Sequence, residues 1–139
     1  MGRWPGDDYD AKKGRPRYRW PDGFSKSQIV YGLSFALETP ADRPLIVVES
    51  PFSVFHLHQV GLPNTVSIFG SSLSDEQADI LICTDRPLIL MFDGDEAGFK
   101  GMRTAAAKLI RHAYVCVNEL PEGRQPDELE RSEIADLLR

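Results

Sequence analysis

Four short apolar runs recur along the chain, and a segment with helical character follows each of them. The expected strands are residues 44–49, 65–69, 87–92 and 113–117, and the expected helices are residues 51–60, a segment opening at Ser74, residues 96–111 and residues 132–138. Nearly continuous apolar runs of this length are typical of strands that are buried on both faces. Alternation of such strands with helices predicts an α/β fold of about four mostly parallel strands, with helices on both faces of the sheet.

The segment before this alternation differs from it in charge. Residues 1–30 carry seven basic side chains against four acidic ones, although the whole chain has a net charge of −5. We expect residues 1–40 to form a basic arm followed by a helix over residues 26–37, and residues 41–139 to form the core domain. A basic arm beside an acidic site would suit an enzyme that acts on a polyanion. A solvated tail is the alternative.

Chain length, hydropathy and cysteine content indicate the number of domains and the cellular location. A chain of 139 residues is expected to form one domain, and no apolar run approaches the length of a membrane span. The N-terminus lacks the apolar segment of a signal peptide, so the cytoplasm is the expected location. Cys83 and Cys116 are too few for a disulfide framework, and we expect both to be small core residues.

Acidic residues end two of the expected strands. Glu49 follows the first strand, and Asp93 and Asp95 follow the third. The carboxyl ends of parallel strands lie at one edge of a sheet, so these three side chains should converge. A hard divalent cation such as Mg²⁺ would relieve their repulsion. The alternative is that such acids face water or cap the next helix, as Asp95 could do at Glu96.

Several segments together resemble a known family. In chain order they are Phe24-x-Lys26-Ser27 with Val30-Tyr31-Gly32-Leu33, Glu49 after its apolar strand, Gly70-Ser71-Ser72-Leu73-Ser74-Asp75-Glu76-Gln77, Asp93-x-Asp95-x-Ala97-Gly98, and Leu120-Pro121-Glu122-Gly123 with Pro126-Asp127-Glu128. Over residues 17–130 they are similar to the Toprim domain of DnaG-type primases and the segment just before it. The resemblance implies a Toprim, Rossmann-like fold with a short N-terminal primase-like segment. Ser53 and Gln125 stand where primases often carry further acids, which leaves a second metal position open.

The resemblance also implies roles for individual residues. Asp93 and Asp95, with Asp127, would hold Mg²⁺ or Mn²⁺, and Glu49 would be a further ligand or the general base. Lys26, Arg17 and Arg19 would contact nucleotide or template phosphates.

The activity implied by the resemblance is metal-dependent nucleotidyl transfer, the RNA primer synthesis of DNA replication. Single-stranded DNA template and nucleotides would be the ligands, with a zinc-binding or helicase partner on another chain and no membrane. A Toprim nuclease and a non-catalytic nucleic-acid module are the alternatives within the family. Outside it, an Asp-x-Asp phosphatase would place its acids after the first long strand rather than the third.

Overall fold

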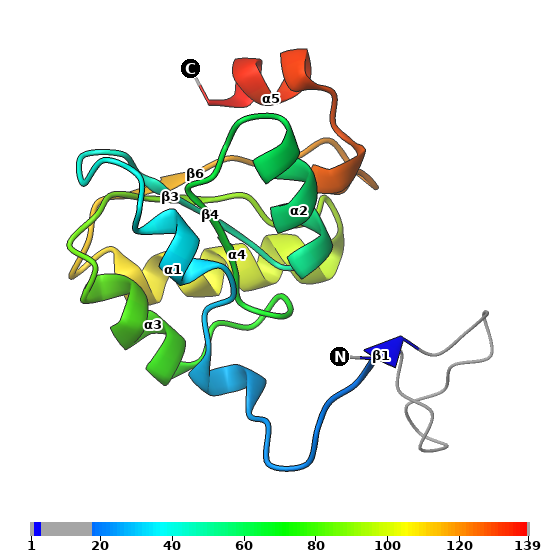
Figure 1. The fold of residues 1–139 in the computed structure, drawn as a ribbon. Helices are drawn as coiled ribbons and strands as arrows, with labels where there is room; N and C mark the ends of the chain where they lie inside the picture. The colour runs from blue at the N-terminus through cyan, green and yellow to red at the C-terminus, as the bar shows by residue number, and fades with distance from the viewer. Residues whose placement is uncertain (1, 4–17, 139) are drawn as a thin grey trace.

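A parallel sheet organises the chain, and helices surround it (Figure 1). The computed structural model describes residues 2–3 and 18–138. The sheet consists of β3 (Leu45–Val48), β4 (Thr65–Ser67), β5 (Leu88–Leu90) and β6 (Val115–Val117), whereas β1 (Gly2–Arg3) and β2 (Tyr18–Arg19) form a separate antiparallel pair. The helices are α1 (Leu33–Ala36), α2 (Pro51–Gln59), α3 (Asp75–Ile82), α4 (Glu96–Leu109) and α5 (Arg131–Leu137), with 3₁₀ turns η2 (Lys26–Gln28) and η3 (Pro126–Glu128). Within residues 18–138, none of these helices combines the length and the apolar character needed to cross a membrane.

The order of strands in the sheet is β4-β3-β5-β6, and every neighbouring pair is parallel. On the central strand β3, Val47 pairs with Val66 of β4 on one side and with Leu90 of β5 on the other. Parallel strands joined by helices all end at one edge of the sheet. The segments that follow β3 and β5 therefore leave the sheet side by side, which confirms the predicted parallel α/β architecture.

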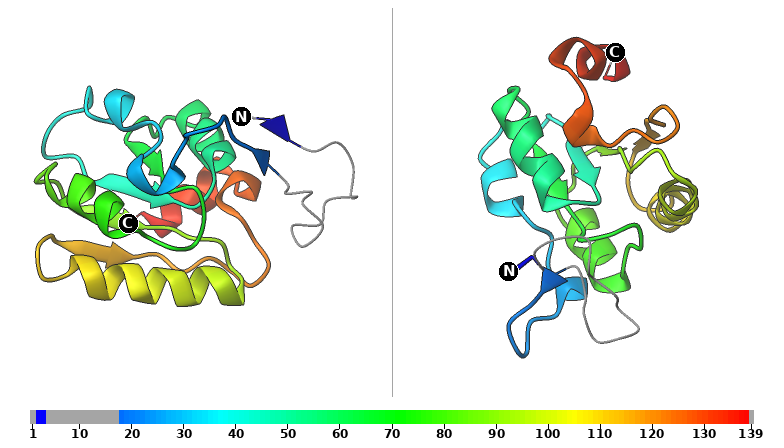
Figure 2. Two further views of the ribbon diagram at one scale, coloured as in Figure 1. Left: turned by 90° about the horizontal axis from the view of Figure 1, so that it is seen from below. Right: turned by 90° about the vertical axis from the view of Figure 1, so that its right-hand side faces the viewer.

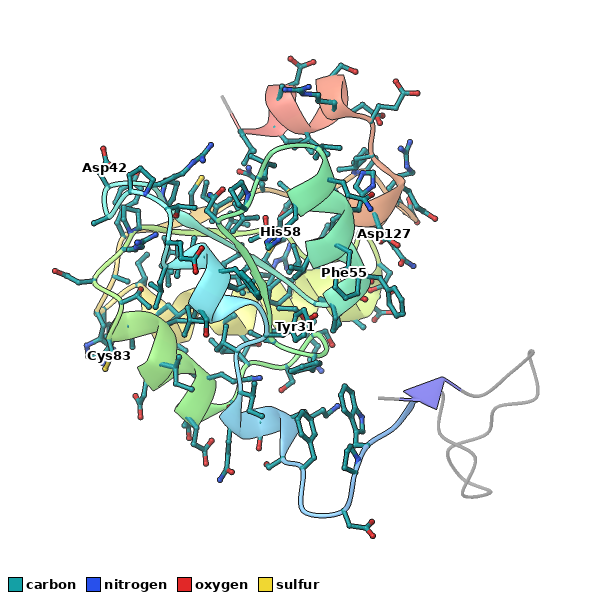
Figure 3. All side chains as sticks on the ribbon, in the orientation of Figure 1. Tyr31, Asp42, Phe55, His58, Cys83 and Asp127 are labelled. Atoms are coloured by element: carbon teal, nitrogen blue, oxygen red, sulfur yellow. The ribbon has the colours of Figure 1, made fainter. Side chains whose placement is uncertain are left out.

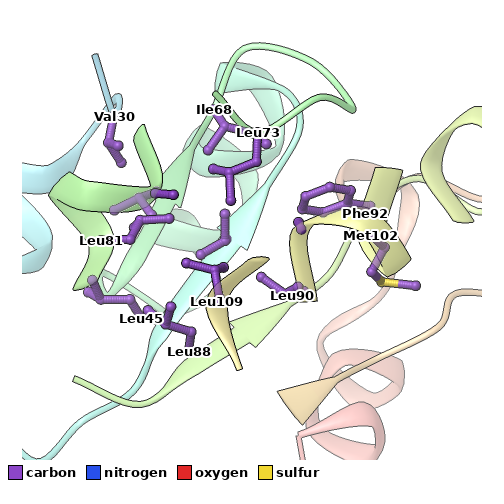
Figure 4. Packing of buried hydrophobic residues seen from close by; sticks show 14 of the residues in the cluster. Val30, Leu45, Ile68, Leu73, Leu81, Leu88, Leu90, Phe92, Met102 and Leu109 are labelled. Atoms are coloured by element: carbon purple, nitrogen blue, oxygen red, sulfur yellow. The ribbon is translucent and has the colours of Figure 1, made fainter. Parts of the chain in front are cut away.

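Two hydrophobic clusters lie on opposite faces of the sheet. Leu45 and Val47 of β3 belong to the cluster covered by α3 and α4, whereas Ile46 and Val48 belong to the cluster under α2 and α5. This division follows from the two-residue period of a strand. Figure 4 shows the first cluster, with Leu109 of α4 among the strand side chains. In the right-hand view of Figure 2, α4 is seen end on, on the side of the sheet away from α2. Helices thus cover both faces, as predicted.

The predicted helix over residues 26–37 is wrong. Only η2 and the short α1 are helical there. Between them, Tyr31 pairs with Ser67 next to β4, each backbone N–H donating to the other's carbonyl at 2.8 and 3.0 Å. Gly32 follows with a φ of 80°, a left-handed conformation that cannot continue a helix. The apolar spacing in this segment therefore comes from residues that pack on the sheet from extended backbone, and the domain boundary expected near residue 40 stays a prediction.

Arg86, which precedes β5, is a buried cation that no sequence motif distinguishes. It is 6% exposed, and its guanidinium donates to four oxygen atoms at 2.8–3.2 Å, which belong to the backbone of Ala36, Leu37 and Thr39 and the hydroxyl of Thr39. These carbonyls lie at and just after the end of α1, where backbone carbonyls lack a full set of intrahelical donors. Arg86 therefore ties the end of α1 to the sheet.

The expectation that both cysteines are core residues is also wrong, because Cys83 and Cys116 are exposed. Cys83 is the C-terminal cap of α3, and Cys116 lies in β6, an edge strand of the sheet. One side of an edge strand has no neighbouring strand, and β6 is mostly exposed or half-buried. The apolar sequence around Cys116 therefore does not translate into burial.

Candidate active site

Glu49 and Asp93 meet at the carboxyl edge of the sheet because their strands are neighbours. β3 and β5 pair in parallel, so the chain leaves both strands at the same level. The backbone N–H of Asp93 donates to Oε1 of Glu49 at 3.0 Å. On the other side, the hydroxyl of Ser67 donates to the backbone carbonyl of Glu49 at 2.8 Å. The structure thus brings two of the predicted acids into direct contact.

The carboxylate of Asp93 lacks the partners that buried polar groups normally have. Its Oδ1 atom is buried and has no hydrogen-bond partner in the described part of the chain. Burial, followed by the negative charges of Asp95, Asp127 and Glu128, raises the pKa of Asp93 to about 6. A buried, unpaired carboxylate costs free energy. A positively charged ligand at this position would therefore be bound favourably.

The pKa of Glu49 is raised as well. Burial is the main cause that raises the pKa of Glu49 to about 7, and the charges of Asp93 and, less strongly, Asp95 add to it. The hydrogen bond from the backbone of Asp93 acts in the opposite direction. A carboxyl group with this pKa exists in both protonation states near neutral pH, which is what a general acid or base requires.

Asp95 is the N-terminal cap of α4. Its Oδ1 accepts a hydrogen bond from the backbone N–H of Gly98 at 2.7 Å. A side chain at position 98 would collide with the carbonyl of Asp93 and come within 2.8 Å of Oε1 of Glu49, so glycine is needed there. A carboxylate has two oxygen atoms, and the cap uses one of them. The helix-cap alternative and the ligand interpretation of Asp95 are therefore compatible.

Asp127 reaches the site from η3, near the end of the chain. The hydroxyl of Ser53, a buried residue of α2, donates to Oδ1 of Asp127 at 3.1 Å. The charge of Asp127 is also one of the causes that raise the pKa of Asp93. Ser53 stands where the family resemblance expects an acid, and here it orients Asp127 instead. Sequence reasoning identified Ser53 only as a missing acid and missed this interaction.

A backbone clamp holds the loop between the two aspartates. The N–H of Gly94 donates to the carbonyl of Arg124 at 2.8 Å, and the N–H of Gly123 donates to the carbonyl of Gly94 at 2.6 Å. A side chain at position 94 would run into the carbonyl of Pro121. Residues 121–124 therefore press against the loop that carries Asp93 and Asp95, and the glycine between the two aspartates is the sequence signal for this contact.

Lys26 is the predicted phosphate-binding cation that the structure places at this edge. It is exposed in η2, and its Nζ donates to the carbonyl of Phe69 at 3.5 Å. The next residue, Gly70, donates its N–H to the carbonyl of Glu49 at 2.9 Å, so Lys26 lies one loop away from Glu49. Arg17 lies outside the described residues, and the structure describes Arg19 only as part of β2.

The residues at this edge suit a hard divalent cation that they share with other ligands. Within residues 2–3 and 18–138, no three or more His, Cys, Asp or Glu side chains are grouped as they would be to hold a metal alone. Mg²⁺ is commonly bound by one or two carboxylates, with water and substrate phosphates completing its shell. The unpaired Oδ1 of Asp93 and the second oxygen of Asp95 match that pattern.

Comparisons with known proteins point to one family. The Toprim domain model matches residues 43–117. The DNA primase of Pseudomonas aeruginosa is 34% identical over 146 residues, which cover 99% of this chain and 21% of the primase. The crystal structure of the zinc-binding and RNA polymerase domains of Aquifex aeolicus primase matches with a TM-score of 0.80 and 28% identity, over 99% of this chain and 35% of that one. The structure of the DnaG primase catalytic domain bound to ssDNA matches with a TM-score of 0.76 and 26% identity, over 99% of this chain and 45% of that one.

The match extends over nearly all of this chain, although the chain spans only about a fifth of the length of the Pseudomonas aeruginosa primase. The residues matched by the Toprim model begin just before β3 and end with β6, so they contain the whole parallel sheet. Glu49, Asp93 and Asp95 all lie within them. On the sequence match and the shared fold, the chain belongs to the Toprim domain family.

Proposed function

We propose that this chain carries the metal-dependent nucleotidyl-transfer site of a primase-like enzyme, which makes RNA primers on a single-stranded DNA template. The observation that carries the proposal is the buried, unpaired Oδ1 of Asp93, whose backbone N–H contacts Glu49, at the carboxyl edge of a Toprim sheet. The DNA primases among its relatives support the choice of reaction, and the ssDNA in the structure of one relative supports the choice of template.

Asp93 and Asp95 hold Mg²⁺ or Mn²⁺ in this proposal, and Asp127 adds negative charge beside them. Such an ion, when bound, would supply the positive charge that neutralises nucleotide phosphates during transfer. Glu49 accepts the proton of the attacking hydroxyl, a role for which its raised pKa is suited. The Asp93 N–H orients Glu49 by donating to one carboxylate oxygen, which leaves the other for the reacting group.

The basic residues bind the substrates in the same proposal. Lys26, Arg17 and Arg19 contact the phosphates of the incoming nucleotide or of the template strand. The proposed partners include a zinc-binding or helicase protein on another chain. The proposed location is the cytoplasm.

Primer synthesis by the purified chain tests the reaction. The chain is incubated with single-stranded DNA, labelled ribonucleotides and Mg²⁺ or Mn²⁺, beside the variant Asp93→Asn. Metal-dependent synthesis that this variant abolishes supports the proposal. Cutting of the DNA strand would instead assign the site to a Toprim nuclease, and absence of both reactions would favour a non-catalytic nucleic-acid module.

Binding of Mn²⁺ provides a readout that does not depend on activity. Mn²⁺ is titrated into the protein and followed by electron paramagnetic resonance. We expect Asp93→Asn to abolish the bound signal. Asp95→Asn is the matched variant, because asparagine is as good an N-terminal cap as aspartate and so preserves α4 while removing one ligand charge. Unchanged Mn²⁺ binding in both variants would overturn the assignment of the ligands.

A further inference from the structure

We propose that an aromatic pocket beside the carboxylate edge binds an unpaired nucleobase of single-stranded DNA. The pocket is lined mainly by Trp20, Phe24, Tyr31, Pro51, Phe55 and Phe69. The inference rests on the proposed function, because it takes the ligand of the pocket to be a nucleic acid strand. It adds a site for the base of a nucleotide, whereas the acids and Lys26 bind metal and phosphate.

The walls of the pocket are a connected set of aromatic rings. Trp20 stacks on Phe24, with ring centroids 4.8 Å apart and an interplanar angle of 7°, and its edge-to-face contact with Phe69 spans 5.0 Å. Tyr31 continues the set, with centroid distances of 5.7 Å to Phe69 and 5.9 Å to Phe55. Figure 3 shows Tyr31 and Phe55 on neighbouring elements. These rings enclose a volume of about 330 Å³, within the range of roughly 300–1,000 Å³ typical of small-ligand pockets.

Phe69, whose ring lines the pocket, has a strained backbone conformation. Phe69 has a φ of 61°, which is unfavourable for a bulky side chain. Its N–H is fixed by the hydroxyl of Ser67 at 3.1 Å, and its carbonyl accepts from Lys26. Such strain persists only where the surroundings impose it, and it is concentrated at functional sites.

The pocket lies next to the candidate active site. Pro51 follows Glu49 by two residues and begins α2, while Phe69 precedes Gly70, whose N–H donates to the carbonyl of Glu49. A base held between these two segments would place its own sugar-phosphate close to the carboxylate edge. Lys26, which contacts the carbonyl of Phe69, supplies an exposed cation for an adjacent phosphate.

A nucleobase fits the chemistry of this surface. Phe55 is 48% exposed and Ile29 is 37% exposed, so part of the pocket wall faces solvent. Proteins that bind single strands combine such exposed rings with a nearby cation, because every base has a flat face that can stack. The combination of exposed rings and the nearby Lys26 therefore favours a nucleic acid strand over a purely apolar ligand.

Affinity for oligothymidylate, measured by fluorescence anisotropy without metal, tests the inference. Phe55→Ala should weaken binding roughly 5- to 100-fold, the effect of losing one stacked base. Phe35→Ala is the matched control, because Phe35 is 68% exposed on α1 and does not line this pocket. An abasic strand of equal length should bind wild type and Phe55→Ala equally. Thermal melting of both variants verifies that they fold.

Trp20 reports on the pocket directly. In a Trp4→Phe background it is the remaining tryptophan, and its fluorescence should be quenched by oligothymidylate and not by the abasic strand. Equal affinity of Phe55→Ala and Phe35→Ala for oligothymidylate would overturn the inference while leaving primer synthesis intact. Self-association that Phe55→Ala abolishes, with oligothymidylate binding unchanged, would also overturn it. If no strand bound wild type at all, the inference and the proposed function would both fail.

Discussion

Gln77 and Asp93 are both polar residues on the carboxyl side of the sheet, but they differ in whether their buried polar atoms are hydrogen-bonded. Gln77 is 1% exposed, and its Oε1 accepts from the backbone N–H of Ser74 at 3.1 Å. Its amide NH2 group has two N–H donors, which serve three backbone carbonyls at 2.9–3.0 Å, those of Lys26, Ile29 and Ile68. Asp93, in contrast, keeps a buried oxygen without a partner in the described part of the chain and carries a raised pKa.

The contrast distinguishes a structural polar residue from a functional one. A buried group whose hydrogen bonds are all made contributes to stability and fixes its neighbours, and Gln77 thereby attaches the η2 segment to α3 and β4. A buried group that is left unpaired costs stability unless a ligand completes it. Gln77 should therefore matter for folding, whereas Asp93 should matter for ligand binding and chemistry.

Replacing Asp93 tests the functional side of this contrast and should have the largest effect. Asp93→Asn is expected to lower primer synthesis by about 10²–10³-fold, the loss typical of removing a group that stabilises charge in the transition state. The same change removes a buried repulsive charge, so the free energy of unfolding should stay constant or rise. Primer assays and urea denaturation of the metal-free protein measure the two effects. A variant that is active, or that unfolds much more easily, would contradict the contrast.

Replacing Gln77 tests the structural side. Gln77→Leu preserves volume but removes the amide that donates to three backbone carbonyls and accepts from the N–H of Ser74, which should lower the free energy of unfolding by about 3 kcal/mol or more. Lys26 belongs to the segment held by Gln77, so affinity for single-stranded DNA should fall as well. Mn²⁺ binding should be kept wherever the variant is folded. Urea denaturation and Mn²⁺ titration give both values, and loss of Mn²⁺ binding in the folded variant would break the contrast.

The pH dependence of stability should show the cost of burying Glu49 and Asp93 close together. The pKa values of Glu49 and Asp93 are raised in the folded state, to about 7 and about 6, so the native protein binds more protons than the unfolded chain between about pH 4 and pH 7. Without metal, the free energy of unfolding should therefore fall as the pH rises through this window. Allowing for solvent screening, we expect a loss of about 1–2 kcal/mol.

Urea denaturation in the presence of a chelator, repeated across this pH window, measures that loss. Asp93→Asn should flatten the profile, because it removes one of the two shifted groups and lowers the pKa of the other. Added Mg²⁺ should restore stability mainly at the upper end of the window. A flat profile for the wild-type protein would show that the two carboxyls are solvated like ordinary surface acids.

Ser74 provides the smallest test, because its hydroxyl makes fewer hydrogen bonds than the Gln77 amide: it accepts from the N–H of Gln77 and donates to the carbonyl of Ser27. Ser74 and Gln77 form a capping box at the start of α3. Ser74→Ala removes the hydroxyl that accepts from the N–H of Gln77 at 3.0 Å and should cost about 1 kcal/mol. The free energy of unfolding, measured by urea denaturation, should therefore be clearly higher for Ser74→Ala than for Gln77→Leu. Equal losses would mean that Gln77 acts chiefly through the cap.

The features that could be predicted from sequence are those with a local or periodic cause. The four strands are nearly continuous apolar runs, and parallel pairing follows from the helices between them. Convergence of Glu49 and Asp93 at one edge follows in turn from parallel pairing. The capping box at Ser74 depends on residues three apart and was also predictable.

The features that could not be predicted depend on contacts between distant segments. The apolar spacing of residues 26–37 suits a helix, yet pairing of Tyr31 with Ser67 holds part of that segment extended. The hydrogen bond from Ser53 to Asp127 joins residues 74 positions apart. The clamp on Gly94 likewise needs a loop that lies far along the sequence. Neither a residue's type nor its neighbours in the chain reveal such partners.

The clamp on Gly94 shows that residues after the Toprim match contribute to the site. Residues matched by the Toprim model stop at 117, the last residue of the sheet. The loop that braces Gly94, and the carboxylate of Asp127, both come after that point. A fragment trimmed to residues 43–117 would keep the whole parallel sheet and three of the acids, but it would lose the loop that contacts Gly94 between Asp93 and Asp95. We therefore expect an intact site to require residues beyond 117, the last residue matched by the Toprim model.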